Sequence, residues 1–365
     1  MHLKQLSLIN FKNIAGADVE LGPKFNCFVG NNGSGKTTIL DAVHYLSICK
    51  SFLNSVDSQN IKRDQPFFVL GGTFEKDSEE YQIHCALKRE GKKQFKKNKK
   101  EYKRLMDHVG QFPIVVIAPT DSDIINGGSE LRRKFLDSVI SQMDREYLAT
   151  LVKYNKALQQ RNALLKYFFE NRTFSEADLD VWDVQLASLG QEVYRKRKVF
   201  LDEFILAFTE NYKSIAGSGE EIELTYKSQM LDGEMYDLLK GNVAKDRQST
   251  YTTVGIHKED LELKIDGFPL KKFGSQGPQK STLVSLKFAQ YKVMHEKCGF
   301  TPLLLLDDIF DKLDDERVGQ LLNLVGGKDY GQILITDTHP ERVAALLKGH
   351  KGVKVFPVSN GEIKA

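Results

Sequence analysis

The sequence has few cysteines and no long apolar segment. Its four cysteines are far apart in the chain and form no C-x-x-C pair: Cys27, Cys49, Cys85 and Cys298. Neither a disulfide framework nor a zinc site is therefore expected. No run of eighteen apolar residues occurs, and the first residues lack the apolar stretch of a signal peptide. These absences argue against a secreted or membrane-spanning protein and predict a soluble, cytoplasmic one.

The chain also has little net charge, only +3 over 365 residues, but its positive charge is concentrated in one segment. Residues 88–104 contain ten Lys or Arg and two Glu, with Phe95 and Tyr102 between them. Such a segment neutralises phosphates and releases counterions, which favours salt-sensitive binding of nucleic acid. The lysines expected to contact DNA are Lys92, Lys93, Lys96, Lys97, Lys99 and Lys100. The alternative is a solvated hairpin whose lysines keep an edge strand soluble.

A phosphate-binding loop is the most specific motif in the sequence. Residues 30–37, Gly-Asn-Asn-Gly-Ser-Gly-Lys-Thr, match the pattern G-x-x-x-x-G-K-[ST] without a mismatch. A short apolar run, residues 25–29, precedes the loop and predicts a strand, while the residues after Thr37 have helical apolar spacing. Because both flanks fit, a chance glycine-rich turn is a poor explanation. The residues expected to bind nucleotide are Gly30, Asn31, Asn32, Gly33, Ser34, Gly35, Lys36, Thr37 and Thr38.

The chemistry of this loop follows from its residue types. Glycines let successive backbone N–H groups point at phosphate oxygens, with a helix N-terminus behind them. Lys36 is expected to reach the β- and γ-phosphates of a nucleoside triphosphate, and the Thr37 hydroxyl to ligate Mg²⁺.

A second acidic element is expected to complete the nucleotide site. Residues 302–308, Pro-Leu-Leu-Leu-Leu-Asp-Asp, predict a buried strand that ends in two carboxylates. Buried aspartates without a partner are costly, and two adjacent acids at a strand end are what a magnesium–nucleotide site needs: one acid for the Mg²⁺ shell and a neighbour able to orient or deprotonate water. Ser275, Gln276 and Gly277 precede a periodic helix and indicate a second anion site at its N-terminus, the alternative being an ordinary helix cap.

The remaining chain divides into β-rich and helical parts. Residues 1–10 alternate in polarity and are expected to pair with Val19–Leu21 as a hairpin, and residues 112–118 predict a central buried strand. Residues 130–170 are helical in composition, and Ser175 with Asp178 predicts the start of a second helix.

A polar connection is expected over residues 228–250. Because the phosphate loop and the acidic strand must share one nucleotide, we expect an ATPase lobe of residues 1–125 plus 250–365 and an inserted, mainly helical lobe of residues 126–249.

In this order, the phosphate loop, the Ser-Gln-Gly element, the Leu-Leu-Leu-Leu-Asp-Asp strand and Lys312-Leu313-Asp314 resemble an ABC-type ATPase head. The fold class implied is α/β, a P-loop ATPase head of mixed β-sheets and helices with an inserted α-helical lobe. Within that group the sequence resembles the RecF family over essentially the whole chain. The blocks that carry this resemblance are residues 8–13, 40–42, 50–52, 118–121, 132–137, 160–165, 182–190 and 255–261.

The resemblance implies a weak ATPase that acts as a switch. Lys36 and Thr37 would serve in cis, Asp307 would hold Mg²⁺, and Asp308 would stand where related ATPases place the catalytic Glu. Ser275–Gly277 of one subunit would close over the γ-phosphate held by another, with Asp314 at that interface. ATP would thus join two copies into a homodimeric clamp on DNA.

The family also implies substrates and partners. The clamp would hold single-strand/double-strand junctions of gapped DNA and act with RecR and RecO to load RecA, in DNA repair, recombination, replication and the SOS response. The alternative is an ABC-type ATPase subunit coupled to transport or to a nuclease. The lysine segment and the RecF-like middle blocks favour the clamp.

Some positions depart from the family pattern. Ser34 stands where Gln is frequent, Lys12 replaces a common Arg, and Pro278 interrupts the Ser-Gln-Gly signature. Asp308 is one methylene shorter than Glu, which fits slow hydrolysis. His339 is a candidate γ-phosphate sensor, and the alternative is a surface histidine in a loop.

Overall fold

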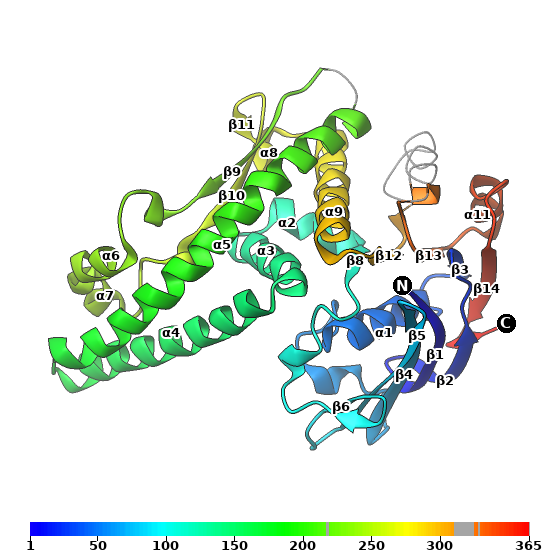
Figure 1. Cartoon of the computed structure of the whole chain (residues 1–365), viewed down its shortest axis with the longest axis horizontal. Coiled ribbons are helices and arrows are strands. Elements are labelled where there is room, and N and C mark those ends of the chain that lie inside the picture. Colours follow the sequence, from blue (N-terminus) through cyan, green and yellow to red (C-terminus); the bar gives the residue numbers. More distant parts are fainter. Residues whose placement is uncertain (217–218, 310–324, 328, 365) are drawn as a thin grey trace. The chain divides into compact units, whose positions relative to one another are not determined.

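The computed structural model describes residues 1–216, 219–309, 325–327 and 329–364. The chain forms two compact units, residues 1–121 with 290–365 and residues 122–289 (Figure 1). Residues 250–289 thus pack in the second unit, with residues 122–249, although they were expected in the ATPase lobe.

The first layer of unit 1 is a six-stranded sheet in the order β2-β1-β4-β5-β6-β7, with antiparallel neighbours. Every second residue of β4 is buried up to Phe74, as expected for a sheet with one face on the core. The predicted pairing of the first ten residues with residues near Val19 is confirmed as the β1–β2 hairpin. The strands are β1 (His2–Phe11), β2 (Ile14–Glu20), β4 (Phe67–Lys76), β5 (Glu79–Lys88), β6 (Gln94–Lys97) and β7 (Lys100–Glu101).

The second layer of unit 1 is a sheet in the order β15-β14-β3-β13-β12-β8, parallel from β14 to β8. Its strands β3, β12 and β13 are buried at every position, which explains their continuous apolar sequence. The carboxyl ends of parallel strands meet at one edge, where ligands bind in α/β proteins. The strands are β3 (Phe25–Val29), β8 (Ile114–Ile117), β12 (Leu303–Leu306), β13 (Ile333–Asp337), β14 (Val353–Ser359) and β15 (Glu362–Ile363).

The prediction of a central strand at residues 112–118 was wrong in one respect. The strand β8 exists, but it pairs only with β12 and lies at the edge of the described sheet. Ile114, Val115 and Ile117 are nevertheless buried, and Val116 is partly buried, so an edge strand can carry a continuous apolar sequence.

Helix α1 (Lys36–Ile48) joins the two sheets of unit 1 into one core. It contacts β1, β4 and β5 of the antiparallel sheet and β8 and β13 of the parallel one. Its apolar side chains Ile39, Leu40, Val43 and Leu46 are fully buried in one cluster with side chains of both sheets. The N-terminus of α1 is therefore held firmly at the edge where β3 ends. Helix α11 (Pro340–Leu346) follows β13.

The core of unit 2 is a hairpin of two long helices, α4 (Arg145–Asn171) and α5 (Glu176–Ala216), preceded by α2 (Ser122–Asn126) and α3 (Ser129–Met143). Figure 1 shows α4 and α5 alongside one another. The Asp144 carboxylate caps α4 by accepting from the Tyr147 N–H at 2.8 Å. The Ser175 hydroxyl accepts from the Asp178 N–H at 3.2 Å, which confirms the predicted cap of the second helix.

A small antiparallel sheet, β11-β10-β9, completes unit 2. The polar connection expected at residues 228–250 instead contains two short helices, α6 (Met235–Gly241) and α7 (Val243–Ser249). Their buried Met235 and Leu239 are too few to give a helical period in the sequence. The remaining elements are β9 (Ile222–Lys227), β10 (Asp260–Ile265), β11 (Phe268–Pro269), α8 (Leu270–Phe273) and α9 (Gln276–Cys298), the last of which ends in unit 1.

Across the described ranges, no helix has the length and the apolar character needed to cross a lipid bilayer.

Candidate nucleotide-binding site and its surroundings

The loop between β3 and α1 has the backbone shape that phosphate binding needs. Gly33 and Gly35 have φ values of 78° and 116°, which side chains other than glycine rarely adopt. A Cβ atom on Gly30 would lie 2.1 Å from the Val358 carbonyl oxygen, so that position has no room for a side chain. The Gly30 N–H donates to the Asp337 carbonyl at 3.2 Å and fixes the loop to the end of β13.

The Lys36 ammonium is held inside the curve of this loop. It donates to the Gly30 and Asn31 carbonyl oxygens at 2.8 and 3.1 Å, and the residue is only 4% exposed. A lysine in this position presents its third proton to an anion in the loop. The predicted role of Lys36 therefore has the required geometry.

Four side chains meet beside the start of α1. The Thr37 hydroxyl donates to the Asp307 carboxylate at 2.9 Å, and the Thr336 hydroxyl donates to the same carboxylate oxygen at 2.8 Å. The Asp308 N–H donates to the Thr336 hydroxyl at 2.9 Å, which places Asp308 next to the pair. The two strand ends that the sequence predicts to cooperate are thus brought together.

The electrostatics of Asp307 suit a cation site. Burial raises the pKa of Asp307 to about 6, against the opposing effects of the two hydroxyls and Lys36. A divalent cation next to this carboxylate would favour its ionised form.

The donor set fits Mg²⁺ in particular. A hydroxyl and a carboxylate are the hard oxygen ligands that Mg²⁺ takes from proteins, the rest being waters and phosphate oxygens. The described residues contain no group of three or more His, Cys, Asp or Glu that could enclose a metal ion. The residues present therefore fit Mg²⁺ bound together with a triphosphate.

Asn13, in the β1–β2 turn, is a loop contact that sequence reasoning did not place in the site. Its amide donates to the Gly33 carbonyl at 3.1 Å and accepts from the Thr38 hydroxyl at 2.7 Å. The Ser34 carbonyl accepts from the Gly361 N–H at 2.8 Å, while the buried Ser34 hydroxyl has no hydrogen-bond partner among the residues that the structure describes. An unpaired buried hydroxyl in the loop is consistent with a site that takes a polar ligand.

A buried ion pair connects three of the sequence blocks that carry the family resemblance, residues 8–13, 40–42 and 50–52. Lys12 and the fully buried Asp41 approach to 2.5 Å between ammonium nitrogen and carboxylate oxygen. The same carboxylate accepts from the Ser51 hydroxyl at 2.7 Å and from the Phe52 N–H at 2.9 Å. Asp41 thereby ties α1 to the β1–β2 turn and to the segment that follows the helix.

An open groove of about 820 Å³ lies beside this turn, with basic side chains in its wall. Lys62 approaches the loop through Asn13, to whose carbonyl it donates at 2.8 Å. The groove is large enough for a nucleoside, and Lys12 in its wall is the chain neighbour of Asn13, which contacts the phosphate loop. It is lined by Lys12, Ser58, Gln59, Ile61, Arg63, Asp64, Gln65, Pro66 and Arg89.

His339 lies just beyond β13, with its side chain 66% exposed. Its backbone N–H donates to Asp337, whose buried carboxylate also accepts from Arg342 at 2.7 Å. Nothing in the sequence indicated that Asp337 would contact the phosphate loop and His339, because a single aspartate at the end of a strand belongs to no recognisable motif. The sensor role of His339 stays a prediction.

The Ser-Gln-Gly element lies at the start of α9 in unit 2, where Ser275 and Gln276 are exposed. Pro278 is in the first turn of this helix, where backbone N–H groups have no intrahelical acceptor, so the substitution is compatible with the helix. Asp314, with the Lys312–Asp314 segment, lies outside the described residues.

Comparison with known proteins agrees with this geometry. Residues 2–364 match the family model described as the RecF/RecN/SMC N terminal domain. The chain is 48% identical to the DNA replication and repair protein RecF of Flavobacterium johnsoniae, over 98% of this chain and 99% of that protein. It is also 48% identical to the RecF of Phocaeicola vulgatus, over 100% of this chain and 98% of that protein. The chain belongs to the RecF family.

Solved structures confirm the fold class. A structure described as the recombination mediator protein RecF with ATP in the RecFOR pathway has a TM-score of 0.89 at 29% identity, covering 100% of this chain and 97% of that chain. The Smc head domain of Pyrococcus furiosus, at 16% identity and a TM-score of 0.59, shares the fold. The expected ABC-type ATPase head of mixed sheets and helices is thus confirmed. The general role of this RecF-family chain is DNA replication and repair.

The six lysines predicted to bind DNA differ in their surroundings. Lys93 donates to the Asp57 carboxylate and the Cys49 carbonyl, each at 2.7 Å, and is largely buried. Lys97 donates to the Gln111 side chain at 2.6 Å and lies 4.2 Å from the Tyr81 ring centroid, and burial lowers its pKa. Both therefore have structural partners within the chain.

The other four lysines face outward on the β6–β7 hairpin and the turn before it. Lys92, Lys99 and Lys100 are exposed, and Lys96 is half-buried on the face opposite the buried Phe95. Asn98 and Lys99 have positive φ values, so a tight two-residue turn carries Lys99 to the tip of the hairpin.

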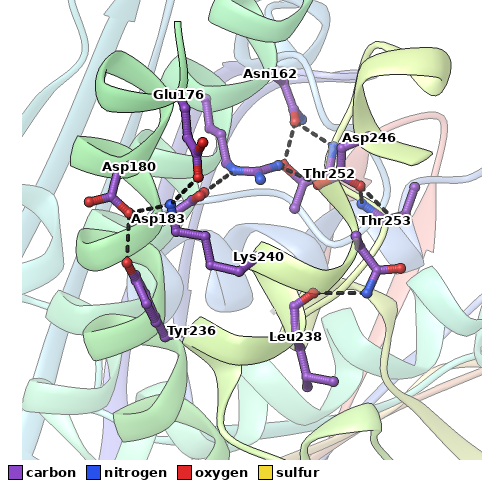
Figure 2. Close-up of polar contacts among 12 residues, drawn as sticks. Asn162, Glu176, Asp180, Asp183, Tyr236, Leu238, Lys240, Asp246, Thr252 and Thr253 are labelled. Carbon is purple, nitrogen blue, oxygen red and sulfur yellow. Dashed lines mark hydrogen bonds and ion pairs between the residues drawn. The ribbon is translucent and has the colours of Figure 1, made fainter. Parts of the chain in front are cut away.

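The RecF-like middle blocks form buried polar networks in unit 2. The Arg161 guanidinium, with no exposed surface, donates at 2.6 Å to each of the fully buried carboxylates of Asp183 and Asp246. Figure 2 shows Asp246 also accepting from Thr253, and Asn162 accepting from Thr252. One arginine thus joins α4, α5 and α7.

A second arginine links the block at residues 255–261 to the helices. Arg197 of α5 donates to Asp137 of α3 at 2.6 Å and to the Ile256 carbonyl at 3.0 Å, and it pairs with buried Glu259. Arg132 pairs with Asp260 at 2.7 Å. These contacts give the block a structural role that its sequence did not reveal.

Proposed function

We propose that this RecF-family chain is an ATP-dependent DNA clamp. In this proposal it binds ATP with Mg²⁺, dimerises, holds single-strand/double-strand junctions of gapped DNA, and assists RecA loading with RecR and RecO. The observation that carries the nucleotide part is the meeting of Thr37, Asp307, Thr336 and Asp308 at the phosphate loop. The solved relative described as RecF with ATP supports the binding of ATP.

Each residue of the site has a proposed task. Backbone N–H groups of residues 30–38 and the Lys36 ammonium bind the phosphates, and the groove beside Asn13 receives the nucleoside. Thr37 and Asp307 hold Mg²⁺, which neutralises charge on the phosphate oxygens when it is bound. Asp308 orients the attacking water and accepts its proton.

The dimer is proposed to form through the signature element. Ser275, Gln276 and Gly277 lie at the N-terminus of the 23-residue helix α9, where unpaired N–H groups and the helix dipole favour an anion. Their proposed ligand is the γ-phosphate bound by a second copy, which would make dimerisation depend on ATP. Hydrolysis would then remove the group that bridges the two copies and reopen the clamp.

Replacement of Asp308 tests the hydrolytic role. We expect Asp308→Asn to slow ATP hydrolysis about 100-fold, because a positioned general base contributes on that order, while ATP affinity changes little. The amide keeps the oxygen that lies near Thr336, so the fold should persist. Single-turnover hydrolysis and equilibrium ATP binding measure the two effects. The exposed Asp202→Asn is the control, and unchanged hydrolysis in Asp308→Asn would remove Asp308 from the mechanism.

Charge reversal tests the proposed DNA contacts of the β6–β7 hairpin. Glutamate in place of Lys96, Lys99 and Lys100 should weaken binding of gapped duplex, and the slope of log affinity against log salt should fall by about one for each lysine that contacts a phosphate. Lys93 and Lys97 are left intact because they have structural partners.

A matched reversal of three exposed lysines elsewhere, Lys348, Lys351 and Lys364, controls for net charge. Equal salt slopes in the wild type and the hairpin variant would show that the hairpin lysines only keep the edge of the sheet soluble.

A further inference from the structure

Two aromatic rings stand exposed on the segment that leads into the signature helix. Phe268 is 56% exposed and Phe273 is 63% exposed, and their ring centroids lie 5.1 Å apart. They belong to β11 and α8, immediately before Ser275. Exposed aromatic pairs are unusual on a protein surface unless the surface binds something.

This aromatic pair is held on a rigid support. The β10–β11 turn has positive φ at Asp266 and Gly267, and Asp266 exchanges two hydrogen bonds of 2.9 Å with Glu221. Leu270, between the two rings in sequence, is fully buried and anchors α8. The rings are therefore presented in a fixed arrangement, which lowers the entropic cost of binding.

Gly274 fixes the connection between the rings and the signature. Its N–H donates to the Leu270 carbonyl at 2.8 Å, and its own carbonyl accepts from the Gln279 side chain at 2.9 Å. A Cβ on Gly274 would lie 2.7 Å from the Leu270 carbonyl oxygen, so only glycine fits here.

The charged residues that follow Asp266 in the chain are all positive as far as residue 295. Residues 267–295 contain five lysines and no Asp or Glu. Lys271 and Lys272, between Phe268 and Phe273, are exposed. Aromatic faces next to ammonium groups match a strand of unpaired nucleotides, whose bases stack on the rings while the phosphates meet the lysines.

We propose that Phe268, Lys271, Lys272 and Phe273 bind single-stranded DNA by base stacking and phosphate contact. This inference rests on the proposed function and deepens it, because it names the surface that recognises the unpaired strand of a gapped duplex. Duplex DNA hides its base faces inside the stack, so the rings discriminate between the two forms.

The test compares two matched variants in anisotropy measurements with labelled oligothymidylate, a blunt duplex and a gapped duplex. The double variant Phe268→Ala and Phe273→Ala should bind oligothymidylate about 10-fold to 100-fold more weakly, since stacking contributes on this scale for each base. Its affinity for blunt duplex should be unchanged. Phe169→Ala, which removes a ring that is 64% exposed on α4, is the control and should bind like the wild type.

The variant Phe273→Trp gives a direct signal of binding. Oligothymidylate should quench the fluorescence of its indole, and the indole should cross-link to an oligonucleotide that carries 5-iododeoxyuridine. Oligothymidylate binding by the double alanine variant that equals the wild type would overturn the inference. Loss of ATP-dependent dimerisation with intact binding of oligothymidylate would overturn it too, and would assign the rings to contact with a second copy. A wild-type protein that binds none of the three DNAs would instead refute the clamp itself.

Discussion

Lys36→Ala is expected to abolish ATP-driven dimerisation. The ammonium group is held in the phosphate loop by the Gly30 and Asn31 carbonyls, and its removal leaves the phosphate charge of ATP without its nearest cation. Charge-assisted hydrogen bonds contribute about 1.5–3 kcal/mol each, so ATP affinity should fall on the order of 100-fold. Titration calorimetry measures the affinity, and sedimentation velocity with and without ATP–Mg²⁺ measures the dimer.

The control for this experiment is Lys50→Ala, which removes an exposed lysine just beyond the same helix and should leave both quantities unchanged. The unfolding midpoint of Lys36→Ala should stay close to that of the wild type, because the loop shape is set by Gly33, Gly35 and the bond to Asp337. An ATP-dependent dimer that persists in Lys36→Ala would show that this loop does not control assembly.

Arg161→Ala is expected to destabilise unit 2 by about 3–5 kcal/mol, because it leaves Asp183 and Asp246 buried without their cation. Burial already raises the pKa of Asp183 against the opposing effect of Arg161. Loss of the arginine raises the folded-state pKa further, so the folded variant gains protons relative to the unfolded chain. The destabilisation relative to the wild type should therefore be smaller at low pH and grow as the pH rises. Urea unfolding at several pH values measures both effects.

Two further variants make this result specific. Arg195→Ala, on the exposed face of α5, should change the free energy of unfolding little at any pH. Asp183→Asn in the Arg161→Ala background should recover part of the loss, since it removes one uncompensated charge. A pH-independent loss in Arg161→Ala, with no recovery by Asp183→Asn, would indicate that Arg161 acts through packing alone.

The sequence alone predicted the elements whose pattern is local. The phosphate loop, its strand and its helix are adjacent in the chain, and the apolar run before Asp307 ends in two acids, so both halves of the site could be recognised from short segments. The two segments were expected to lie together because they must share one nucleotide, and the hydrogen bond from Thr37 to Asp307 joins them. The capping of α5 by Ser175 was equally local.

Contacts between residues far apart in the chain could not be predicted in this way. Lys93 and Lys97 look like their neighbours in the sequence, and only the fold reveals that they contact Asp57 and Gln111. Arg161 and Asp246 are 85 positions apart, and the sequence around neither residue indicates that they form a buried ion pair.

Departures from the family pattern also needed the structure. Lys12 keeps a cation on Asp41 where an arginine is common, and Pro278 falls in the first turn of α9. The ion pair of Lys12 and the position of Pro278 in the helix are compatible with the fold, so neither residue argues against family membership.

The clamp itself is tested most directly by sedimentation of the Asp308→Asn protein with a labelled gapped duplex, with and without ATP–Mg²⁺. Slow hydrolysis should hold the ATP state long enough to observe it. The proposal predicts a monomer without nucleotide and, with ATP–Mg²⁺, a dimer that carries the labelled DNA. A monomer that leaves the DNA unbound under both conditions would contradict the proposal.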